Sequence, residues 1–221
     1  MTQPSPKKDL FSQLAIIAKS LSNPNRLELL DFLAQGERSV DELAKVSGLS
    51  VANTSQHLQD LRRSGLVRNR SEGKQAFYSL SDYKVIELIG LMRNVAESNL
   101  AEIQMLINNY LVAKDNLEPL QRDELLQRVK SGEVVVIDVR PDAEYESGHL
   151  PDALNIPFSR LENELKNLPK DKEIIAYCRG PYCLLSFDAV VQLRAQGFKA
   201  RRLQDGFPEW KLNGLPIEQG I

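Results

Sequence analysis

A polar segment near the middle of the chain separates two different sequence patterns. It covers residues 113–119, reads Ala-Lys-Asp-Asn-Leu-Glu-Pro and ends on proline, which is typical of a linker. Before it, the apolar residues follow helical spacing and then one hairpin; after it, short apolar runs alternate with helical stretches. Because 221 residues give room for two modest domains, the sequence predicts domains over 1–112 and 120–221.

The composition is that of a globular protein. Hydrophobic residues make up 42% and charged residues 26%, with a net charge of −2, which excludes collagen-like and wholly disordered chains. No apolar run approaches the ~20 residues of a membrane-spanning helix, and the N-terminal stretch has no apolar core of a signal peptide. The two cysteines, Cys178 and Cys183, are too few for a secreted disulfide framework. We therefore expect a cytoplasmic protein with free thiols and no membrane partner.

Capping and stop signals divide the first 80 residues into four helices and a hairpin. Asn23-Pro24 and Ser50 are helix-start signals, Ser39-Val40-Asp41-Glu42 is a capping box, and a glycine follows each of the last three helices. The predicted elements are a helix over 10–21, helices that start at 24, 40 and 51 and stop at 36, 48 and 65, and two strands within 67–80 around the turn 71–74.

A heptad pattern predicts one long helix after the hairpin, over 85–110. At ~1.5 Å per residue it would span roughly 39 Å. As a core helix it would bury further apolar residues beside the heptad positions; as a self-association helix it would pair with a second copy. We favour self-association, because the pattern is longer than an 80-residue domain could cover. The heptad residues are Val85, Ile89, Met92, Ala96, Asn99, Ile103, Leu106 and Tyr110.

The third and fourth predicted helices form a helix-turn-helix, with a tight turn at Ser47-Gly48. In the fourth helix, Val51, Thr54, Leu58 and Leu61 share one face, and we expect that face to be buried. The opposite face is polar, as in helices that read the major groove of DNA. Its predicted contacts are Asn53 and Gln56 toward bases, and Ser50, Thr54 and Ser55 toward phosphates. His57 either faces the DNA or forms a hydrogen bond between helices.

A basic stripe follows this helix. Between residues 60 and 74, five basic residues face only two acidic ones, within a half of the chain that is otherwise close to neutral. The hairpin would then lie along the DNA backbone as a wing, with contacts from Arg62, Arg68, Arg70 and Lys74. From the residues alone, a small protein–protein interaction module stays open as the alternative.

The second half alternates strands and helices. Helical stretches at 122–130, 159–167 and 184–196 separate or flank apolar strands at 134–137, 153–156, 174–177 and 199–203. Such alternation predicts an α/β domain with a mainly parallel sheet.

Cys178 lies where a reactive thiol would be expected. It ends an apolar strand, and a short loop of Arg179, Gly180, Pro181 and Tyr182 leads through Cys183 into the next helix. A helix N-terminus concentrates backbone N–H groups, and together with Arg179 it should lower the pKa of the Cys178 thiol. An inert buried cysteine is the alternative, and it fits poorly with this loop.

The first half resembles the winged helix-turn-helix repressors of the ArsR family. The pattern Leu-Ser…Ser-x-His-Leu-x-x-Leu-Arg-x-x-Gly-Leu-Val over 49–67 carries the resemblance, together with the hairpin. It implies a homodimer on a double-stranded DNA operator that represses until an inducer binds. Metal-sensing members place cysteines in the helix matching 41–47, or Asp and His on the last helix. No cysteine precedes Cys178 and the last helix has no histidine, so we expect no metal site and no cofactor.

The second half resembles a single rhodanese domain. The carrying segments are 134–157, 177–183 and 203–218, and they cover nearly all of 120–219. The resemblance implies a persulfide on Cys178, taken from a sulfane-sulfur donor such as thiosulfate or polysulfide and held by the amides of the loop 179–183. The six-residue loop has the length found in sulfurtransferases, whereas related phosphatases and arsenate reductases have a longer one. Asp138, Arg140 and His149 match family motifs in which structural roles are expected.

Two positions depart from the rhodanese pattern. Asp205-Gly206 replaces the usual Gly-Gly beside the site. Cys183 ends the loop where a hydroxyl or small residue is common. Its thiol could attack a persulfide on Cys178 and form a bridge, or it could merely help to hold the loop; both remain open.

Two functions therefore follow from the sequence. In the first, the chain is a dimeric DNA-binding transcriptional regulator whose rhodanese domain senses reactive sulfur or redox signals through Cys178. In the second, it is a working sulfurtransferase, with Cys178 as nucleophile and Arg179 in support, fused to a DNA-binding domain that controls its own operon. An oxyanion reductase or phosphatase is disfavoured by the loop length.

Overall fold

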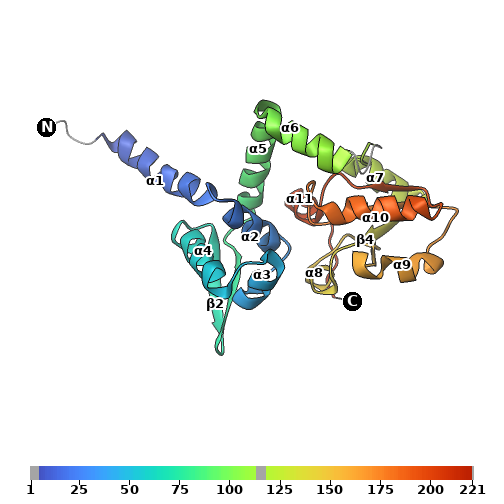
Figure 1. Cartoon of the computed structure of the whole chain (residues 1–221), viewed down its shortest axis with the longest axis horizontal. Coiled ribbons are helices and arrows are strands. Elements are labelled where there is room, and N and C mark those ends of the chain that lie inside the picture. The colour runs from blue at the N-terminus through green and yellow to red at the C-terminus, as the bar shows by residue number, and fades with distance from the viewer. Residues whose placement is uncertain (1–4, 113–117, 221) are drawn as a thin grey trace. The chain divides into compact units, whose positions relative to one another are not determined.

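The computed structural model describes residues 5–112 and 118–220, and these fall into two compact units, Met1–Ile89 and Gly90–Ile221 (Figure 1). Most of the predicted linker, residues 113–117, lies outside the described residues. The predicted fold class is confirmed: a helical winged helix-turn-helix with a small antiparallel sheet comes first, and an α/β domain with a four-stranded parallel sheet comes second.

The first unit contains the predicted helices and hairpin. A two-residue strand that the sequence did not reveal, β1, pairs with the hairpin strand β3 and gives an antiparallel sheet of order β1-β3-β2. The first helix begins at Pro6, four residues earlier than predicted, because proline is well suited to a first helical turn. The elements are α1 Pro6–Leu21, α2 Pro24–Ala34, β1 Arg38–Ser39, α3 Val40–Ser47, α4 Val51–Arg63, β2 Val67–Glu72 and β3 Gln75–Leu80.

The predicted caps set these helix boundaries. The Asn23 side chain accepts a hydrogen bond from the Arg26 amide at 3.2 Å. Ser39 and Glu42 bond to each other's backbone N–H at 3.2 and 2.7 Å, which is the predicted capping box of α3. Gly48 ends α3 in the left-handed region, with φ 69°, where a side chain would be strained. The sequence therefore fixes the turn between α3 and α4 locally.

The long helix predicted over 85–110 is broken, so that prediction is wrong. Helix α5 covers Lys84–Asn99, Leu100 has an extended backbone with φ −110° and ψ 106°, and α6 covers Ala101–Ile107, followed by a π-helical turn at Asn108–Val112. At the break, Asn99, the one polar heptad residue, donates its side-chain N–H to the Val95 carbonyl at 2.7 Å. Such local side-chain bonding competes with helix continuation.

The second unit is built on a parallel sheet of order β5-β4-β6-β7. All four predicted strands are present within a few residues of their expected bounds. Two short helices, α8 and α11, were not predicted. The remaining elements are α7 Arg122–Lys130, β4 Val134–Asp138, α8 Asp142–Ser147, β5 Leu154–Asn155, η2 Phe158–Arg160, α9 Leu161–Glu164, η3 Leu165–Asn167, β6 Glu173–Tyr177, α10 Leu184–Ala195, β7 Ala200–Arg202 and α11 Phe207–Leu212.

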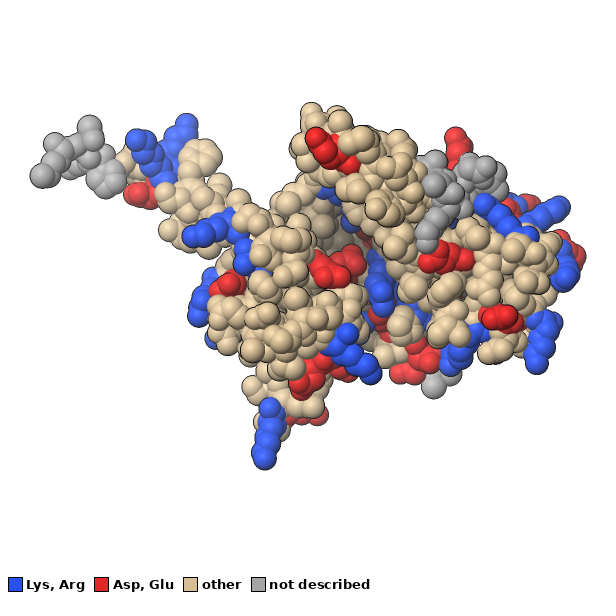
Figure 2. All heavy atoms as spheres, viewed as in Figure 1, with Lys and Arg blue, Asp and Glu red and all other residues tan. Residues whose placement is uncertain are grey.

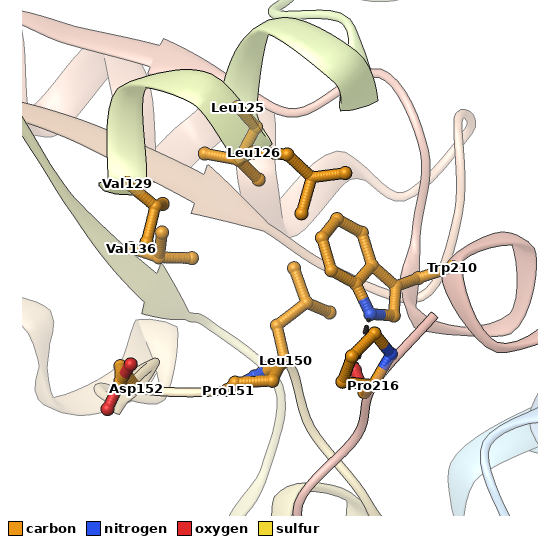
Figure 3. A pocket seen from close by; sticks show the side chains of 9 residues that line it. All are labelled: Leu125, Leu126, Val129, Val136, Leu150, Pro151, Asp152, Trp210 and Pro216. Carbon is orange, nitrogen blue, oxygen red and sulfur yellow. Dashed lines mark hydrogen bonds between the residues drawn. The ribbon is translucent and has the colours of Figure 1, made fainter. Parts of the chain in front are cut away.

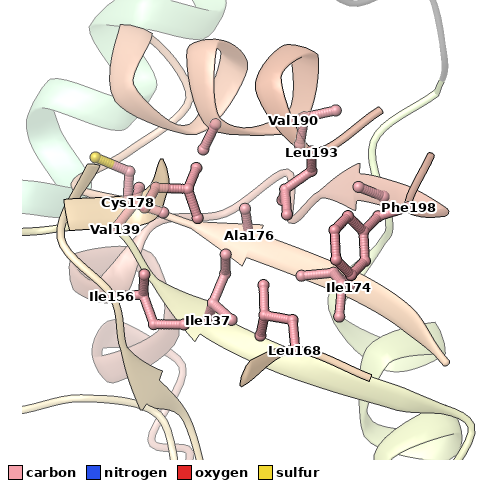
Figure 4. Close-up of a cluster of buried hydrophobic side chains, with 13 residues drawn as sticks. Ile137, Val139, Ile156, Leu168, Ile174, Ala176, Cys178, Val190, Leu193 and Phe198 are labelled. Carbon is pink, nitrogen blue, oxygen red and sulfur yellow. The ribbon is translucent and has the colours of Figure 1, made fainter. Parts of the chain in front are cut away.

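Successive residues of β4 and β6 supply two cores, one on each face of this sheet. Ile174 and Ala176 join a cluster with α10 that also contains Cys178 (Figure 4). Ile175 and Tyr177 join a second cluster with α7 and α11 on the other face. A strand covered on both faces reads as a continuous apolar run, which explains why β6 was easy to predict. It also places Cys178 at the carboxyl end of a central, fully buried strand.

Within the described residues, no helix is both long enough and apolar enough to cross a membrane.

Candidate functional site

Helix α4 has one buried face and one exposed face, as a DNA-reading helix requires. Thr54, Leu58 and Leu61 have no exposed surface, as predicted. Val51 is 51% exposed, so its predicted burial is wrong. It occupies the first position of α4, beyond the cluster in which Leu58 and Leu61 pack.

Ser50 and Thr54 complete the first turn of α4. The Ser50 hydroxyl accepts a hydrogen bond from the Asn53 amide at 3.3 Å, which confirms the predicted cap. The Thr54 hydroxyl donates to the Ser50 carbonyl at 3.0 Å and is buried. Thr54 is therefore not available to a phosphate, and its predicted DNA contact is wrong. Ser50 is exposed and its hydroxyl hydrogen can still be donated.

The polar face of α4 is open to solvent at two of its predicted base-reading residues. Asn53 and Gln56 are exposed, whereas Ser55 and His57 are half-buried. The Gln56 amide donates to Asp60 at 3.3 Å, an exposed bond that a base edge could replace. In the described part of the chain, the buried Nδ1 of His57 has no hydrogen-bond partner. Contact of these residues with DNA remains a prediction.

Two of the four predicted backbone-contacting cations make single neutral contacts. The Arg62 guanidinium donates to the Asn69 side chain at 3.3 Å and so joins the end of α4 to β2. Arg68 donates to the Ser79 hydroxyl at 3.1 Å. Both side chains belong to exposed residues. Their positive charge therefore stays available to a polyanion.

Arg70 differs, because it lies between two carboxylates. Its guanidinium pairs with Glu37 at 2.7 Å and with Glu72 at 2.5 Å, and these hydrogen bonds raise the pKa of Arg70. Figure 2 shows acidic and basic side chains close together on the hairpin. Lys74 lies in the two-residue turn between β2 and β3 and is exposed. Because Arg70 is paired with two carboxylates, Lys74 offers DNA a less compensated charge than Arg70 does.

In the second unit, the loop after β6 brings the two cysteines together. Cys178 is 2% exposed, and the structure joins it to Cys183 in a disulfide with Cα atoms 6.2 Å apart. The expectation of free thiols is thus wrong for this structure. The N–H of Cys183 donates to the Gly180 carbonyl at 3.0 Å, which closes the loop into a turn. Cys183 then occupies the N-cap position of α10.

Arg179 is held by a buried carboxylate. Its Nε and Nη2 donate to the two oxygens of Glu144, on α8, at 2.7 to 3.1 Å, and the Glu144 side chain is 1% exposed. Such a bidentate pair fixes the orientation of the guanidinium. Arg179 therefore ties the start of the cysteine loop to α8, and its charge is balanced there. Activation of Cys178 by Arg179 remains a prediction, and it would have to act while Arg179 is paired with Glu144.

The backbone of Gly206 contacts the same loop. A Cβ atom at this position would lie 2.3 Å from the carbonyl carbon of Arg179 and 2.3 Å from the nitrogen of Gly180. The next amide, that of Phe207, donates to the Cys178 carbonyl at 3.1 Å. The start of α11 therefore supports the cysteine loop, and only glycine fits at the point of contact.

Asp205 replaces the other glycine of the usual pair, and it is accommodated by an ion pair. Its carboxylate lies 3.3 Å from Arg122 of α7. Burial raises the pKa of Asp205, and the charges of Arg122 and Arg93 lower it in part. The substitution thus adds a link between α7 and the turn before α11.

Three further residues of the rhodanese pattern, Asp138, Arg140 and His149, are buried and bonded within the second unit. Asp138 and Arg140 form a fully buried ion pair at 2.6 Å, and Arg140 also donates to the Gly148 carbonyl. The Tyr177 hydroxyl donates to Asp138, and burial raises the pKa of Tyr177 well above its usual value. His149 stacks on the ring of Tyr145 and exchanges backbone hydrogen bonds with Glu218. None of these groups belongs to the cysteine loop. They lie at and beyond the carboxyl ends of β4 and β6, beside that loop.

A hollow in this unit is lined mainly by apolar side chains (Figure 3). It lies between α7, the turn at Leu150-Pro151 and Trp210 of α11, and Asp152 is its one charged lining residue. It belongs to the face of the sheet opposite the cluster that contains Cys178. In addition, no three His, Cys, Asp or Glu side chains among residues 5–112 and 118–220 are grouped to hold a metal ion.

Sequence reasoning missed the partners of the cysteine loop. Glu144 lies on α8, a six-residue helix; Pro141 followed by acidic residues is a helix-start signal that could have revealed it. Arg93 and Glu97, on α5, contact Glu209 and Tyr182, respectively, at 3.3 and 2.5 Å. No local pattern indicates these contacts, because their partners lie 116 and 85 residues away.

Comparison with known proteins agrees with both halves of this description. The model of the bacterial regulatory protein, arsR family, matches residues 23–69, and that of the rhodanese-like domain matches residues 121–213. The HTH-type transcriptional regulator Rv0324 of Mycobacterium tuberculosis is 41% identical over 214 residues, which cover 97% of this chain and 94% of that protein. The chain belongs to this arsR family. It is an HTH-type transcriptional regulator with a rhodanese domain.

Other relatives match one half of this arsR-family regulator. A protein named sulfurtransferase from Allochromatium vinosum is 33% identical over 100 residues, covering 44% of the chain and 92% of that protein. The solution structure of a homodimeric winged helix-turn-helix DNA-binding domain from Mycobacterium bovis is 38% identical, with a TM-score of 0.41, and covers 45% of the chain and 93% of that domain.

Proposed function

We propose that this regulator binds operator DNA as a homodimer and senses sulfane sulfur through the dithiol of Cys178 and Cys183. The observation that carries the proposal is the position of the two cysteines, with Cα atoms 6.2 Å apart across one loop. This separation lies within the range of about 4.4–6.8 Å that a disulfide needs. A lone sulfur carrier requires no second thiol there, whereas a dithiol sensor does.

The proposed chemistry has two steps that balance. The Cys178 thiolate attacks the sulfane sulfur of a persulfide or polysulfide donor, and the donor's S–S bond breaks to release a thiolate. Cys178 then carries a persulfide. The Cys183 thiolate attacks the inner sulfur of that persulfide and expels hydrosulfide. The product is the Cys178–Cys183 disulfide that the structure contains.

Exposed apolar surface supports the homodimer. On α1, Leu10, Phe11 and Leu14 are 59–68% exposed. Leu91 and Val95 of α5 are exposed to a similar extent. Soluble chains rarely leave such helix faces uncovered. A second copy of the chain would cover them, in keeping with the homodimeric winged-helix domain described from Mycobacterium bovis.

The DNA interface leads to a salt-dependence prediction. We expect Arg62→Ala to weaken operator binding and to reduce the slope of log affinity against log salt by about 1, because one phosphate contact is lost. Lys166→Ala, an exposed lysine of the rhodanese domain, should leave both affinity and slope unchanged. Fluorescence anisotropy with an operator fragment at several salt concentrations measures both values. An unchanged slope for Arg62→Ala would remove this residue from the interface.

The sensing role leads to a second prediction. We expect the operator affinity of the wild-type protein to differ about 5–150-fold between the reduced and polysulfide-treated states, which is the range of ordinary allosteric coupling. Cys183→Ser should lose most of this difference, because the bridge cannot form. The same anisotropy assay, with mass spectrometry of each sample, tests it. Equal affinity in the reduced and treated wild type would contradict sensing.

One observation favours a second candidate, a working sulfurtransferase. The likeness to the sulfurtransferase from Allochromatium vinosum covers 92% of that protein. In that function Cys178 passes its sulfane sulfur to an external thiol or cyanide before Cys183 reacts. Steady-state turnover with thiosulfate and cyanide separates the two candidates: rapid turnover together with unchanged operator affinity favours the enzyme.

A further inference from the structure

The cysteine loop is attached to helix α5 through Tyr182. The Tyr182 hydroxyl donates to the Glu97 carboxylate at 2.5 Å, and its ring lies under the guanidinium of Arg93, 5.2 Å from the ring centre. Arg93 also pairs with Glu209 of α11 at 3.3 Å. All these residues belong to the second compact unit, Gly90–Ile221.

Glu209, the partner of Arg93, also lies beside the cysteine loop. One of its oxygens accepts the Gly206 amide at 3.1 Å, at the point where Gly206 touches the loop backbone. Its carboxylate also lies 3.6 Å from where a Cβ of Gly180 would be. Arg93 and Glu97 of α5 therefore both contact Tyr182 inside the cysteine loop. Arg93 also contacts Glu209, which accepts the Gly206 amide.

The other end of α5 is packed in the winged-helix core. Val85 and Ile86 are 6% and 7% exposed, and Val85 belongs to the same hydrophobic cluster as Leu58 and Leu61 of the DNA-reading helix. Helix α5 is continuous from Lys84 to Asn99. The first turn of α5 thus packs in the hydrophobic cluster that contains Leu58 and Leu61 of α4. About three turns later the same helix carries Glu97, which contacts the cysteine loop.

We propose that Glu97 and Arg93 are positioning residues that transmit the state of the Cys178–Cys183 pair to the winged helix-turn-helix through α5. This inference rests on the proposed sensing function and names its route. Tyr182 directly precedes Cys183, so the bridge holds the tyrosine on Glu97 and Arg93. When the bridge is absent, the loop is released from its covalent closure and Tyr182 loses that constraint.

The hydrogen bond between Tyr182 and Glu97 can form and break as the loop moves. Desolvation raises the pKa of Tyr182, as does its hydrogen bond to Glu97, so the hydroxyl keeps its proton and remains a donor at neutral pH. Hydrogen bonds to a charged acceptor are stronger than neutral ones. Because Tyr182 is 44% exposed, water can replace the contact when the loop moves.

The test compares Glu97→Ala, Glu97→Gln and the control Glu102→Ala in the full-length protein. Glu102 is an exposed carboxylate in the first turn of α6. Two quantities are measured in the reduced and bridged states: operator affinity by anisotropy, and amide hydrogen exchange over residues 90–99. In the wild type we expect exchange there to be about tenfold slower in the bridged state, equivalent to 1.4 kcal/mol.

Glu97→Ala should remove both differences between the two states while sulfur loading of Cys178, measured by mass, stays unchanged. Glu97→Gln should retain part of them, since its amide oxygen still accepts a weaker bond, and Glu102→Ala should behave as the wild type. A purely structural role for Glu97 would shift both states equally and leave their ratio intact, which would overturn the inference.

The two measurements separate this inference from the proposed function. If operator affinity never responds to the bridge but exchange over 90–99 does, and only with Glu97 present, the contact stands and DNA sensing fails. If operator affinity responds while exchange does not, or responds equally in Glu97→Ala, sensing stands and the route through α5 is wrong.

Discussion

We expect the replacement of Cys178 with serine to abolish sulfur loading of the protein. A serine hydroxyl cannot hold a persulfide, and Cys183 is the only other sulfur nucleophile of the cysteine type in the chain. The wild type, reduced and then treated with polysulfide, should gain about 32 Da for one bound sulfur, or lose two hydrogens where the bridge has closed. The Cys178→Ser protein should show neither change by intact-mass spectrometry.

Cys183→Ser is the matched control for this experiment. It keeps Cys178, so it should accumulate the persulfide that the wild type converts into the bridge. The two variants together assign the nucleophile and the resolving thiol. Sulfur loading that persists in Cys178→Ser and disappears in Cys183→Ser would exchange the two roles.

We expect Arg179→Ala to slow sulfur loading of Cys178 without abolishing it. Its guanidinium is paired with Glu144, so removal of Arg179 leaves a buried carboxylate without its main cation as well as changing the charge near Cys178. Leaving a buried polar group unsatisfied costs about 1–3 kcal/mol. A slower reaction in Arg179→Ala therefore has two causes. Adding Glu144→Gln to Arg179→Ala removes the buried negative charge, so the slowing that remains reports the changed charge near Cys178.

Local chemistry explains which parts of the fold the sequence predicts. Asn23, Ser39 and Ser50 each bond to an amide three residues ahead, so the helix starts are set by neighbours in sequence. The strand β6 is visible in the sequence for another reason: both faces of the sheet are covered, so residues 174–177 form one continuous apolar run. The positions of α4 and of Cys178 in the sequence of elements follow from these signals.

Long-range contacts explain what the sequence does not predict. The heptad pattern runs through Asn99 to Ile103, yet the helix breaks at Leu100, and the last turn of α5 contacts the cysteine loop through Glu97. Thr54 has the residue type of a phosphate ligand, but the packing of α4 buries it. Glu97 reaches Tyr182 across 85 residues. For Thr54 and Glu97, contacts with residues on other elements, and not the local pattern, decide the surroundings of the side chain.

The close approach at Gly206 implies a large effect for one added methyl group. Gly206→Ala should lower the free energy of unfolding of the rhodanese domain by at least about 3 kcal/mol, the upper end for overpacking, because the new Cβ would meet backbone atoms of Arg179 and Gly180 at 2.3 Å. Gly206 has φ −96°, so alanine's own backbone preferences are not the cause. Displacing the loop should also prevent closure of the Cys178–Cys183 bridge.

Trp210 makes this prediction selective, because it is the chain's one tryptophan and lies 3% exposed in the rhodanese domain. Urea unfolding followed by its fluorescence should show Gly206→Ala unfolding at a clearly lower urea concentration. Gly180→Ala is the control on the other side of the contact: its Cβ would meet Glu209 oxygens at 3.6 and 3.7 Å, an ordinary distance, so its transition should stay near that of the wild type. Coincident transitions for Gly206→Ala and the wild type would mean that α11 can withdraw from the loop, and support of the loop by Gly206 would then be wrong.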